Sequence, residues 1–419
     1  MAMLNLFSAE MRRDPYPVYE QIRSRSPVLY HEPLDLWMIF DYEGVKRALV
    51  DPETFSSRAT PPGSSGPPPD WFIFYDPPRH TKLRGLIQKA FTPRVIASLE
   101  RSIRQLSKEL LDQAIERGTN RPATGFPATD RATAGSAPTL DVADDFSVPL
   151  ALRVIAALIG IPPADYLRFK RWSDVTLKLA DTVTRSGDLA QLAGEVGAVK
   201  AEMATYLAGL LEERRREPQD DLLSTLMAAE IDGERLTREE MLGFFQLLLV
   251  AGNETTTNLI NNAMLTFLEH PDQLARLRAD RELLPSAIEE VLRYRSPLQA
   301  VFRTTKREVE VHGQAIPAGK LVLPMIGSAN RDPRQFRDPN RFDITRDPNP
   351  HIAFGHGIHF CIGAPLSRLE ARIGLTDLLE RLEDIELAGD TWEPRQAFNV
   401  LGPCRLPIRF QPARSAAVT

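Results

Sequence analysis

One segment of the chain, from Arg238 to His270, restricts the fold more than any other. Its middle, Met241 to Ala251, is apolar on nearly every side of a helix, and a helix of that kind has to be buried all round. The rest of the chain must therefore supply structure on every side of it. The 43% hydrophobic content of the chain is sufficient for a core of that size.

Directly after this apolar stretch come Gly252, Glu254 and Thr255, which an ordinary buried helix does not favour. A glycine inside a helix costs about 1 kcal/mol relative to alanine. A carboxylate that enters a core costs more unless it is paired or its pKa rises. One interpretation is a glycine required for packing, with Thr255 bonding back to the carbonyl of Ala251, which leaves Glu254 unexplained. We favour a locally opened helix that lines a cavity, with an acid and a hydroxyl positioned to deliver protons.

A second unusual segment is the glycine-rich loop of residues 354–363. Its glycines permit backbone angles or close approaches that a Cβ would forbid, so the loop can surround a flat, bulky group and present the sulfur of Cys361. A helical pattern begins near Ala364, and thiolates are favoured near helix N-termini. This indicates a ligand loop.

Other interpretations of Cys361 stay open at this point. A free cysteine is usually a small buried apolar residue. A bridge to Cys404 is conceivable, although two cysteines in 419 residues indicate a reducing compartment. A zinc site is a further alternative, but its ligand spacing is not one of the usual patterns. Its ligands would be Cys361 with His351, His356 and His359.

Helices dominate the remaining pattern, and strands are few and short. Helices are predicted at residues 16–25, 42–50, 94–117, 148–159, 164–179, 190–216, 238–270, 287–295 and 365–382. Strands are predicted at residues 28–31, 36–40, 309–311, 321–326 and 405–410. Residues 59–70 are rich in proline and glycine and predict a loop, and residues 118–138 predict a flexible insertion. The sequence predicts a mainly α fold with small β-sheets.

Two charged pairs lie on predicted helices. A helix that starts near Pro78 places His80 and Arg84 one turn apart on one face, where they can clamp an anionic ligand. Glu290 and Arg293 are three residues apart on another helix. Charged pairs of both kinds more often lie on a solvated surface than in a functional site.

Charge and hydropathy exclude several classes of protein. The net charge of −5 and the pI near 5.9 give no reason to expect a nucleic-acid partner. Residues 1–13 lack the apolar core of a signal peptide, and no run approaches the roughly 18 apolar residues of a membrane span. We therefore expect a soluble, cytoplasmic protein that does not enter a membrane, and we expect it to be a monomer.

Taken together and in this order, these motifs resemble the cytochrome P450 family. The resemblance covers nearly the whole chain, and the cysteine loop with a Glu-x-x-Arg pair upstream is highly specific. The matching motifs are Phe-Gly-x-Gly-x-His-x-Cys-x-Gly at 354–363, Ala-Gly-x-Glu-Thr-Thr at 251–256, Glu-x-x-Arg at 290–293, His-x-x-x-Arg at 80–84 and Asn-Arg-Phe at 340–342. The resemblance implies one triangular, mainly α domain over residues 1–419, without a fused reductase domain.

The resemblance also implies haem b, with the thiolate of Cys361 as proximal ligand of the iron. Phe354 would pack beside the thiolate, and Gly355 and Gly363 would give the macrocycle its space. Glu290 and Arg293 would form a buried network with Arg341 behind the loop. The haem propionates would be held by His80, Arg84, Arg303 and His359.

The implied activity is that of a haem-thiolate monooxygenase, which inserts one atom of O2 into a small organic molecule by hydroxylation or epoxidation. Thr255 would hydrogen-bond the bound oxygen and Glu254 would relay protons from solvent. Gly252, next to Ala251, would leave room for dioxygen in the helix groove. Electrons would come from a separate ferredoxin and its NAD(P)H-dependent reductase. An acidic carrier would dock on basic residues, with Lys82, Lys89, Arg94, Arg368 and Arg372 as candidates.

The substrate pocket predicted by analogy is largely apolar, so we expect an apolar small molecule. Its residues would be Trp71, Leu247, Leu248, Leu298, Val301, Phe302, Val400 and Leu401. A peroxide-driven peroxygenase is an alternative, but such enzymes tend to replace the acid–alcohol pair that Glu254 and Thr255 form here. A non-enzymatic haem-binding sensor or carrier is another, and it gives no reason to bury those two residues.

Overall fold

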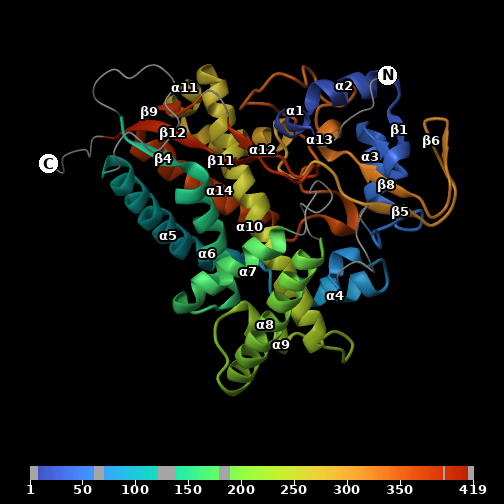
Figure 1. Cartoon of the computed structure of the whole chain (residues 1–419), viewed down its shortest axis with the longest axis horizontal. Coiled ribbons are helices and arrows are strands. Elements are labelled where there is room, and N and C mark those ends of the chain that lie inside the picture. The colour runs from blue at the N-terminus through green and yellow to red at the C-terminus, as the bar shows by residue number, and fades with distance from the viewer. Residues whose placement is uncertain (1–7, 61–69, 121–136, 179–188, 390–391, 414–419) are drawn as a thin grey trace.

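The computed structural model describes residues 8–60, 70–120, 137–178, 189–389 and 392–413. Helix α10 (Arg238–Glu269) passes through the middle of the molecule, and the other helices lie around it (Figure 1). A capping box starts this helix, in which Thr237 and Glu240 each accept a hydrogen bond from the other's backbone N–H. Most of its residues from Gly243 to Phe267 are buried, as predicted for a helix covered on every side.

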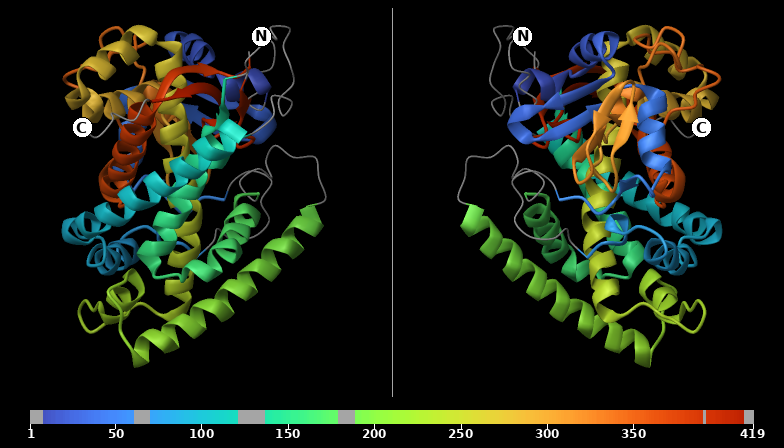
Figure 2. Two further views of the ribbon diagram at one scale, coloured as in Figure 1. Left: turned by 90° about the vertical axis from the view of Figure 1, so that its left-hand side faces the viewer. Right: turned by 90° about the vertical axis from the view of Figure 1, so that its right-hand side faces the viewer.

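The other helices form a layer around α10, and Figures 1 and 2 place α8 and α9 together at one end of the molecule. These helices are α1 (Ala9–Arg13), α2 (Tyr16–Arg25), α3 (Tyr42–Val50), α4 (Arg79–Gln88), α5 (Pro93–Asn120), α6 (Val148–Ile159), α7 (Tyr166–Leu177), α8 (Leu189–Arg216), α9 (Leu222–Ala228), α11 (Pro271–Ala279), α12 (Leu284–Tyr294), α13 (Ile326–Ala329) and α14 (Ala364–Arg381). Shorter helical turns are η1 (Glu32–Leu34), η2 (Phe72–Phe74), the π-helix η3 (Val142–Ser147), η4 (Pro163–Asp165), η5 (Arg281–Leu283) and η6 (Gly357–His359).

The strands form small sheets beside this helical body. The largest has the order β1-β2-β8-β5-β3 and combines antiparallel pairs with the parallel pair of β2 and β8. The others are β4-β12-β9, β6-β7 and β10-β11. The strands are β1 (Val28–His31), β2 (Leu36–Ile39), β3 (Phe55–Ser56), β4 (Thr139–Asp141), β5 (Arg303–Thr305), β6 (Val309–Val311), β7 (Gln314–Ile316), β8 (Leu321–Pro324), β9 (Leu382–Leu387), β10 (Glu393–Pro394), β11 (Pro403–Arg405) and β12 (Pro407–Pro412). The fold is mainly α with small β-sheets, as predicted.

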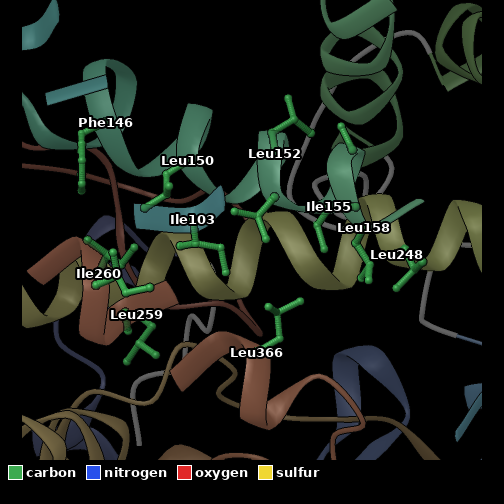
Figure 3. Packing of buried hydrophobic residues seen from close by; sticks show 14 of the residues in the cluster. Ile103, Phe146, Leu150, Leu152, Ile155, Leu158, Leu248, Leu259, Ile260 and Leu366 are labelled. Carbon is green, nitrogen blue, oxygen red and sulfur yellow. The ribbon is translucent and has the colours of Figure 1, made fainter. Parts of the chain in front are cut away.

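The largest apolar cluster surrounds α10. Figure 3 shows Ile155 of α6 pointing at one side of this helix, and Leu366 of α14 lies on the other side. Full burial of a Leu or Ile side chain contributes about 1.5–3 kcal/mol, so this cluster is a main source of stability. It holds α10 between two helices, and α14 is the one that follows Cys361 directly.

Most predicted elements agree with the structure within a few residues, and the helices at 42–50 and 148–159 agree at both ends. The prediction for 118–138 is wrong at its start, because α5 continues to Asn120. A Cβ at Gly118 would lie 2.6 Å from the carbonyl oxygen of Thr139, so glycine allows the helix to approach β4. Residues 121–136, residues 61–69 of the predicted loop and Leu179 of a predicted helix lie outside the described residues.

Within the described part of the chain, no helix combines the length and hydropathy needed to cross a membrane.

Candidate functional site

The loop that carries Cys361 lies between η6 and α14. Gly355 and Gly357 have φ values of 75° and 71°, in the left-handed region that favours glycine. The amide of Cys361 donates a hydrogen bond of 2.9 Å to the carbonyl of Phe354 and closes the loop. At Gly363 φ is −84°, and a Cβ there would only touch the sulfur of Cys361 at 3.9 Å. The backbone therefore requires glycine at the first two positions and not at the third.

The sulfur of Cys361 lies among groups that stabilise a negative charge. Burial raises the pKa of the Cys361 thiol, while the backbone amides of Gly363 and Ala364 and the guanidinium groups of Arg84 and Arg368 act in the opposite direction. Cys361 and Cys404 are both free thiols, so no disulfide joins them. The surroundings of Cys361 suit a thiolate ligand.

Two histidines from distant parts of the chain meet near this loop. The rings of His80 on α4 and His359 on η6 lie 4.0 Å apart between centroids. Both ring nitrogens of His80 are buried without a hydrogen-bond partner, whereas Nε2 of His359 lies 2.9 Å from Oγ of Ser57. Burial, together with the charge of Arg84, lowers the pKa of His80 to about 4. Burial and the neighbouring His80, Arg303 and Arg84 lower the pKa of His359 to about 2.

The two arginines complete a cluster of basic groups. Arg84 donates a hydrogen bond of 2.6 Å to the carbonyl of Phe360, and Arg303 on β5 donates one of 2.8 Å to the carbonyl of Phe302. Burial lowers the pKa of Arg303 to about 10. Buried donors without acceptors are rare in folded proteins. Because His80 lacks acceptors and three other basic groups surround it, the cluster suits an anionic ligand with several oxygen atoms.

These residues fit a haem group. An iron porphyrin with two carboxylates needs a soft sulfur ligand at one face and basic donors at one edge. Cys361 supplies the sulfur, and the cluster of His80, Arg84, Arg303 and His359 supplies donors that the described residues leave partly unused. The structure thus brings together, from three separate segments, residues that the resemblance had assigned to one cofactor.

The proposed acid–alcohol pair lies in the middle of α10. Thr255 donates a hydrogen bond of 2.6 Å from Oγ1 to the carbonyl of Ala251, as in the packing interpretation of this helix. Ala251 is exposed and Thr255 is half-buried, although the helix is buried on both sides of them along the chain. Glu254 is buried, with 8% of its surface exposed. The structure therefore places a buried carboxylate beside an accessible hydroxyl.

Gly252 has a packing role in the structure. A Cβ at this position would lie 2.5 Å from Cδ1 of Ile155, which comes from α6. Figure 3 shows Ile155 pointing at α10. The absent side chain makes room for the packing of α6, and the expectation that Gly252 leaves room for dioxygen stays a prediction. The helical repeat turns Gly252 toward α6, so the packing interpretation holds for this residue.

The network around Glu290 contains the predicted residues and one further arginine. Glu290 and Arg293 on α12 are fully buried and form two hydrogen bonds of 2.8 Å. A second arginine, Arg346, also binds this carboxylate. Its Nε lies 3.1 Å from both carboxylate oxygens of Glu290. Arg341 contributes only its carbonyl oxygen, which accepts from Arg293, while its side chain is 64% exposed. Arg341 therefore belongs to the network through its backbone, and its guanidinium does not contact Glu290.

The residues predicted for the substrate pocket do not all pack together. Leu298 and Val400 pair in an isolated β-bridge. Trp71, Leu247 and Leu248 belong to the cluster around α10, with Trp71 close to Gly243. Val301 packs against the cluster of the five-stranded sheet. Phe302 and Leu401 belong to a cluster with the N-terminal helices, where Phe302 faces Phe398 at 6.1 Å. Phe302 therefore packs in a different cluster from Trp71, Leu247 and Leu248.

The other histidines near Cys361 do not form a metal centre. Nε2 of His351 lies 2.9 Å from a carboxylate oxygen of Glu289, which also binds Arg368. Among the residues that the structure describes, no group of three or more His, Cys, Asp or Glu side chains is arranged to hold a metal ion. The zinc interpretation of the loop is therefore not supported.

Sequence reasoning missed several residues of the site. Ser57, Arg346 and Ile155 reach it from segments that carry no recognisable motif. Glu289 had a signal, since it stands next to Glu290, but two adjacent glutamates on a helix are usually solvated. Each of these residues is identified only by its partner in space.

The comparisons with known proteins agree with this site. The family model described as "Cytochrome P450" matches residues 187–401. The chain is 41% identical to "Putative cytochrome P450 YjiB" of Bacillus subtilis over 93% of both chains, and 38% identical to "Cytochrome P450 monooxygenase PikC" of Streptomyces venezuelae over 99% of this chain and 95% of the other. The crystal structure of CYP109E1 from Bacillus megaterium in complex with corticosterone superposes with a TM-score of 0.83 at 39% identity, over 96% of this chain and 99% of that one.

The chain belongs to the cytochrome P450 family. It is a haem-dependent monooxygenase, an oxidoreductase that uses O2 and a redox partner to oxidise a small molecule.

Proposed function

We propose that this P450 hydroxylates or epoxidises an apolar small molecule, with electrons from a separate ferredoxin and an NAD(P)H-dependent reductase. We further propose that residues 1–419 form one domain that surrounds haem b. The placement of the haem rests on one observation. Buried basic groups cluster around His80, and the ring nitrogens of His80 have no hydrogen-bond partner. Paired carboxylates at that position would satisfy His80, and the sulfur of Cys361 would bind the iron.

The bound haem supplies the activation of O2, and the side chains of this chain supply position and protons. Arg84, Arg303, His80 and His359 would bind the propionates, and Phe354 would shield the sulfur of Cys361. Thr255 can exchange its present acceptor, the carbonyl of Ala251, for a ligand in the groove, since a hydroxyl rotates at little cost. Glu254 next to it would supply the protons that O–O cleavage consumes.

An apolar substrate is supported by the residues around the middle of α10. Leu247 and Leu248 lie one turn before the exposed Ala251, and Trp71 flanks the same helix. Leu298 and Val400 would close the pocket from the strand side. The CYP109E1 structure contains corticosterone, so steroids are the first class that we propose to test on this chain.

A separate electron donor would dock near the loop of Cys361. Phe360, next to the ligand, is 41% exposed, and Arg94 on α5 is exposed. Three of the other candidate cations already form ion pairs, namely Lys82 with Glu234, Arg368 with Glu289 and Arg372 with Glu100. We therefore propose that an acidic ferredoxin would contact Phe360 and Arg94 in preference to these paired residues.

The decisive experiment compares the wild type with Cys361→Ala and Thr255→Ala. The reduced wild type under carbon monoxide should give the red-shifted Soret band of a thiolate-ligated haem, and Cys361→Ala should lose it. Thr255→Ala should retain the band and consume NAD(P)H, but should release hydrogen peroxide in place of product. A band that persists in Cys361→Ala would reject the assigned ligand.

The alternatives give different results in the same assay. A peroxygenase would turn over with peroxide at least as fast as with the ferredoxin system. A sensor or carrier would keep its haem in Thr255→Ala and show no change in any oxidation, because no reaction would depend on that hydroxyl. Steroid-induced shifts of the ferric spectrum measure binding independently of turnover.

A further inference from the structure

A second charged network lies against the ring of Phe354, directly behind the loop of Cys361. Glu289 on α12 binds Arg368 on α14 through two hydrogen bonds of 2.7 and 2.8 Å. This is a bidentate pair, which fixes the plane of the guanidinium as well as its position. The network thus joins the helix before the loop to the helix after it.

His351 holds the carboxylate from the other side. Its Nε2 lies 2.9 Å from Oε2 of Glu289, and its Nδ1 accepts a hydrogen bond of 3.2 Å from the amide of Ala353. Because Nδ1 is an acceptor, the proton of the neutral ring is on Nε2 and points at Glu289. The His351 side chain is 5% exposed, so this contact is protected from solvent. A histidine without a role in the cysteine motif is thereby assigned one.

The guanidinium that this network fixes lies over an aromatic ring. The central carbon of Arg368 is 4.5 Å from the centroid of the Phe354 ring, within the range of a cation–π contact. The carbonyl of Phe354 accepts the amide hydrogen of Cys361, so the ring and the sulfur belong to one closed loop. Burial raises the pKa of the Cys361 thiol, and the charge of Arg368 is among the groups that act against this rise. The loop that presents the sulfur thus carries an aromatic ring that contacts a fixed positive charge.

We infer that Arg368, fixed over Phe354 by Glu289 and His351, is a positioning residue that sets the reduction potential of a haem bound to Cys361. This inference rests on the proposed ligand role of Cys361. A positive charge near the sulfur stabilises the reduced state, which carries one negative charge more, and therefore raises the potential. The negative charge of Glu289 partly offsets this rise in potential. Its hydrogen bonds also keep the guanidinium of Arg368 in place.

The test is the midpoint potential of the haem protein in three variants and one control variant. Arg368→Gln removes a positive charge and should lower the potential. Glu289→Gln removes a negative charge, keeps the shape of the side chain, and should raise it. Arg368→Lys keeps the charge and should stay close to the wild type. For each charge change we expect the ratio of reduced to oxidised protein at a fixed potential to change at least about threefold, which corresponds to about 28 mV at 59 mV per tenfold change.

The chain offers a matched control one turn further along α14. Arg372 forms an ion pair of 3.3 Å with Glu100, and the exposures of this pair, 41% and 36%, are close to the 37% and 30% of Arg368 and Glu289. Arg372→Gln should leave the potential unchanged. Opposite shifts for Glu289→Gln and Arg368→Gln, with an unchanged control, would support the inference.

A purely structural role would give another pattern. Both charge variants would then shift the potential in the same direction or not at all, or Arg372→Gln would shift it equally, and each of these results would overturn the inference. If Arg368→Gln does not fold, the upward shift of Glu289→Gln against an unchanged Arg368→Lys decides the question. These measurements use proteins that retain the thiolate band under carbon monoxide. Loss of that band in Cys361→Ala tests the proposed function separately.

Discussion

The side-chain amide of Asn253 donates a hydrogen bond of 2.9 Å to Oγ of Ser173, and so joins α10 to α7 within the core. The hydroxyl of Ser173 in turn lies 3.4 Å from the carbonyl of Leu249, one turn before Asn253 on α10. Asn253 stands between Gly252 and Glu254 in the chain, so this contact holds the segment that carries the proposed acid–alcohol pair. No motif in the sequence identifies Ser173.

Ser173→Ala should therefore destabilise the protein by about 1–3 kcal/mol, because it leaves the buried amide of Asn253 without its acceptor. The measurement is chemical unfolding of the haem-bound protein. Thr176→Val is the matched control, since the hydroxyl of Thr176 is also buried on α7 but donates its hydrogen bond to Trp172 of its own helix. Equal losses in both variants would contradict a specific link between α7 and α10.

Arg346 and Arg341 should respond very differently to the same change. Arg346→Gln removes one of the two guanidinium groups on a fully buried carboxylate and should cost at least about 3 kcal/mol. Arg341→Gln changes an exposed side chain and should stay within about 0.5 kcal/mol of the wild type. Unfolding midpoints and haem retention of the two variants measure this difference. A larger loss for Arg341→Gln would refute the arrangement around Glu290.

The packing role of Gly252 predicts a pair of coupled substitutions. Gly252→Ala should bring a methyl group against Ile155, and such overpacking costs about 1–3 kcal/mol, offset in part by about 1 kcal/mol of helix propensity. Ile155→Val removes the carbon atom that lies nearest. Gly252→Ala should therefore be better tolerated in the Ile155→Val background than in the wild type. A double-mutant cycle of unfolding free energies with no coupling would contradict this contact.

The haem-free protein should lose stability between pH 6.5 and about 4. Burial and nearby arginines lower the folded-state pKa of His80 to about 4, so in this range the unfolded chain binds a proton that the folded chain does not. Stability is fully present above pH 6.5 and falls with pH, by an amount on the order of 3 kcal/mol for His80 alone. Unfolding of the apoprotein against pH measures the loss, which should be smaller in His80→Gln. Bound haem should flatten the curve, because its carboxylates would stabilise protonated histidines. An apoprotein with the same pH dependence as His80→Gln would contradict this account.

The sequence predicted those parts of the molecule that local patterns determine. The apolar length of α10 and the glycines at 355 and 357 have direct physical signatures, and the structure confirms the burial and the backbone angles they indicate. Arg341 was chosen over Arg346 because it lies in a motif, although either arginine can reach a carboxylate from the same loop. Which one does so depends on the path of residues 330–350 through the fold.

The role of Gly252 also shows that local patterns do not identify partners from distant parts of the chain. A glycine inside a helix indicates that something approaches closely, but it does not identify what approaches. The answer came from α6, which lies about a hundred residues earlier in the chain. Ser57 is a similar case, since a serine before a proline-rich loop gives no sign that it meets a histidine of the cysteine loop.

The network around Glu290 has a consequence for laboratory evolution of this enzyme. Its carboxylate accepts hydrogen bonds from Arg293 and Arg346, from the side-chain amide of Asn349, and from the backbone of Asp343. A library that randomises residues 341–349 will therefore mix two kinds of position within a few residues of each other. Arg341 should tolerate most substitutions, whereas substitutions of Arg346 should destabilise the whole chain. Variants chosen from this loop for new activities should be filtered at position 346 first.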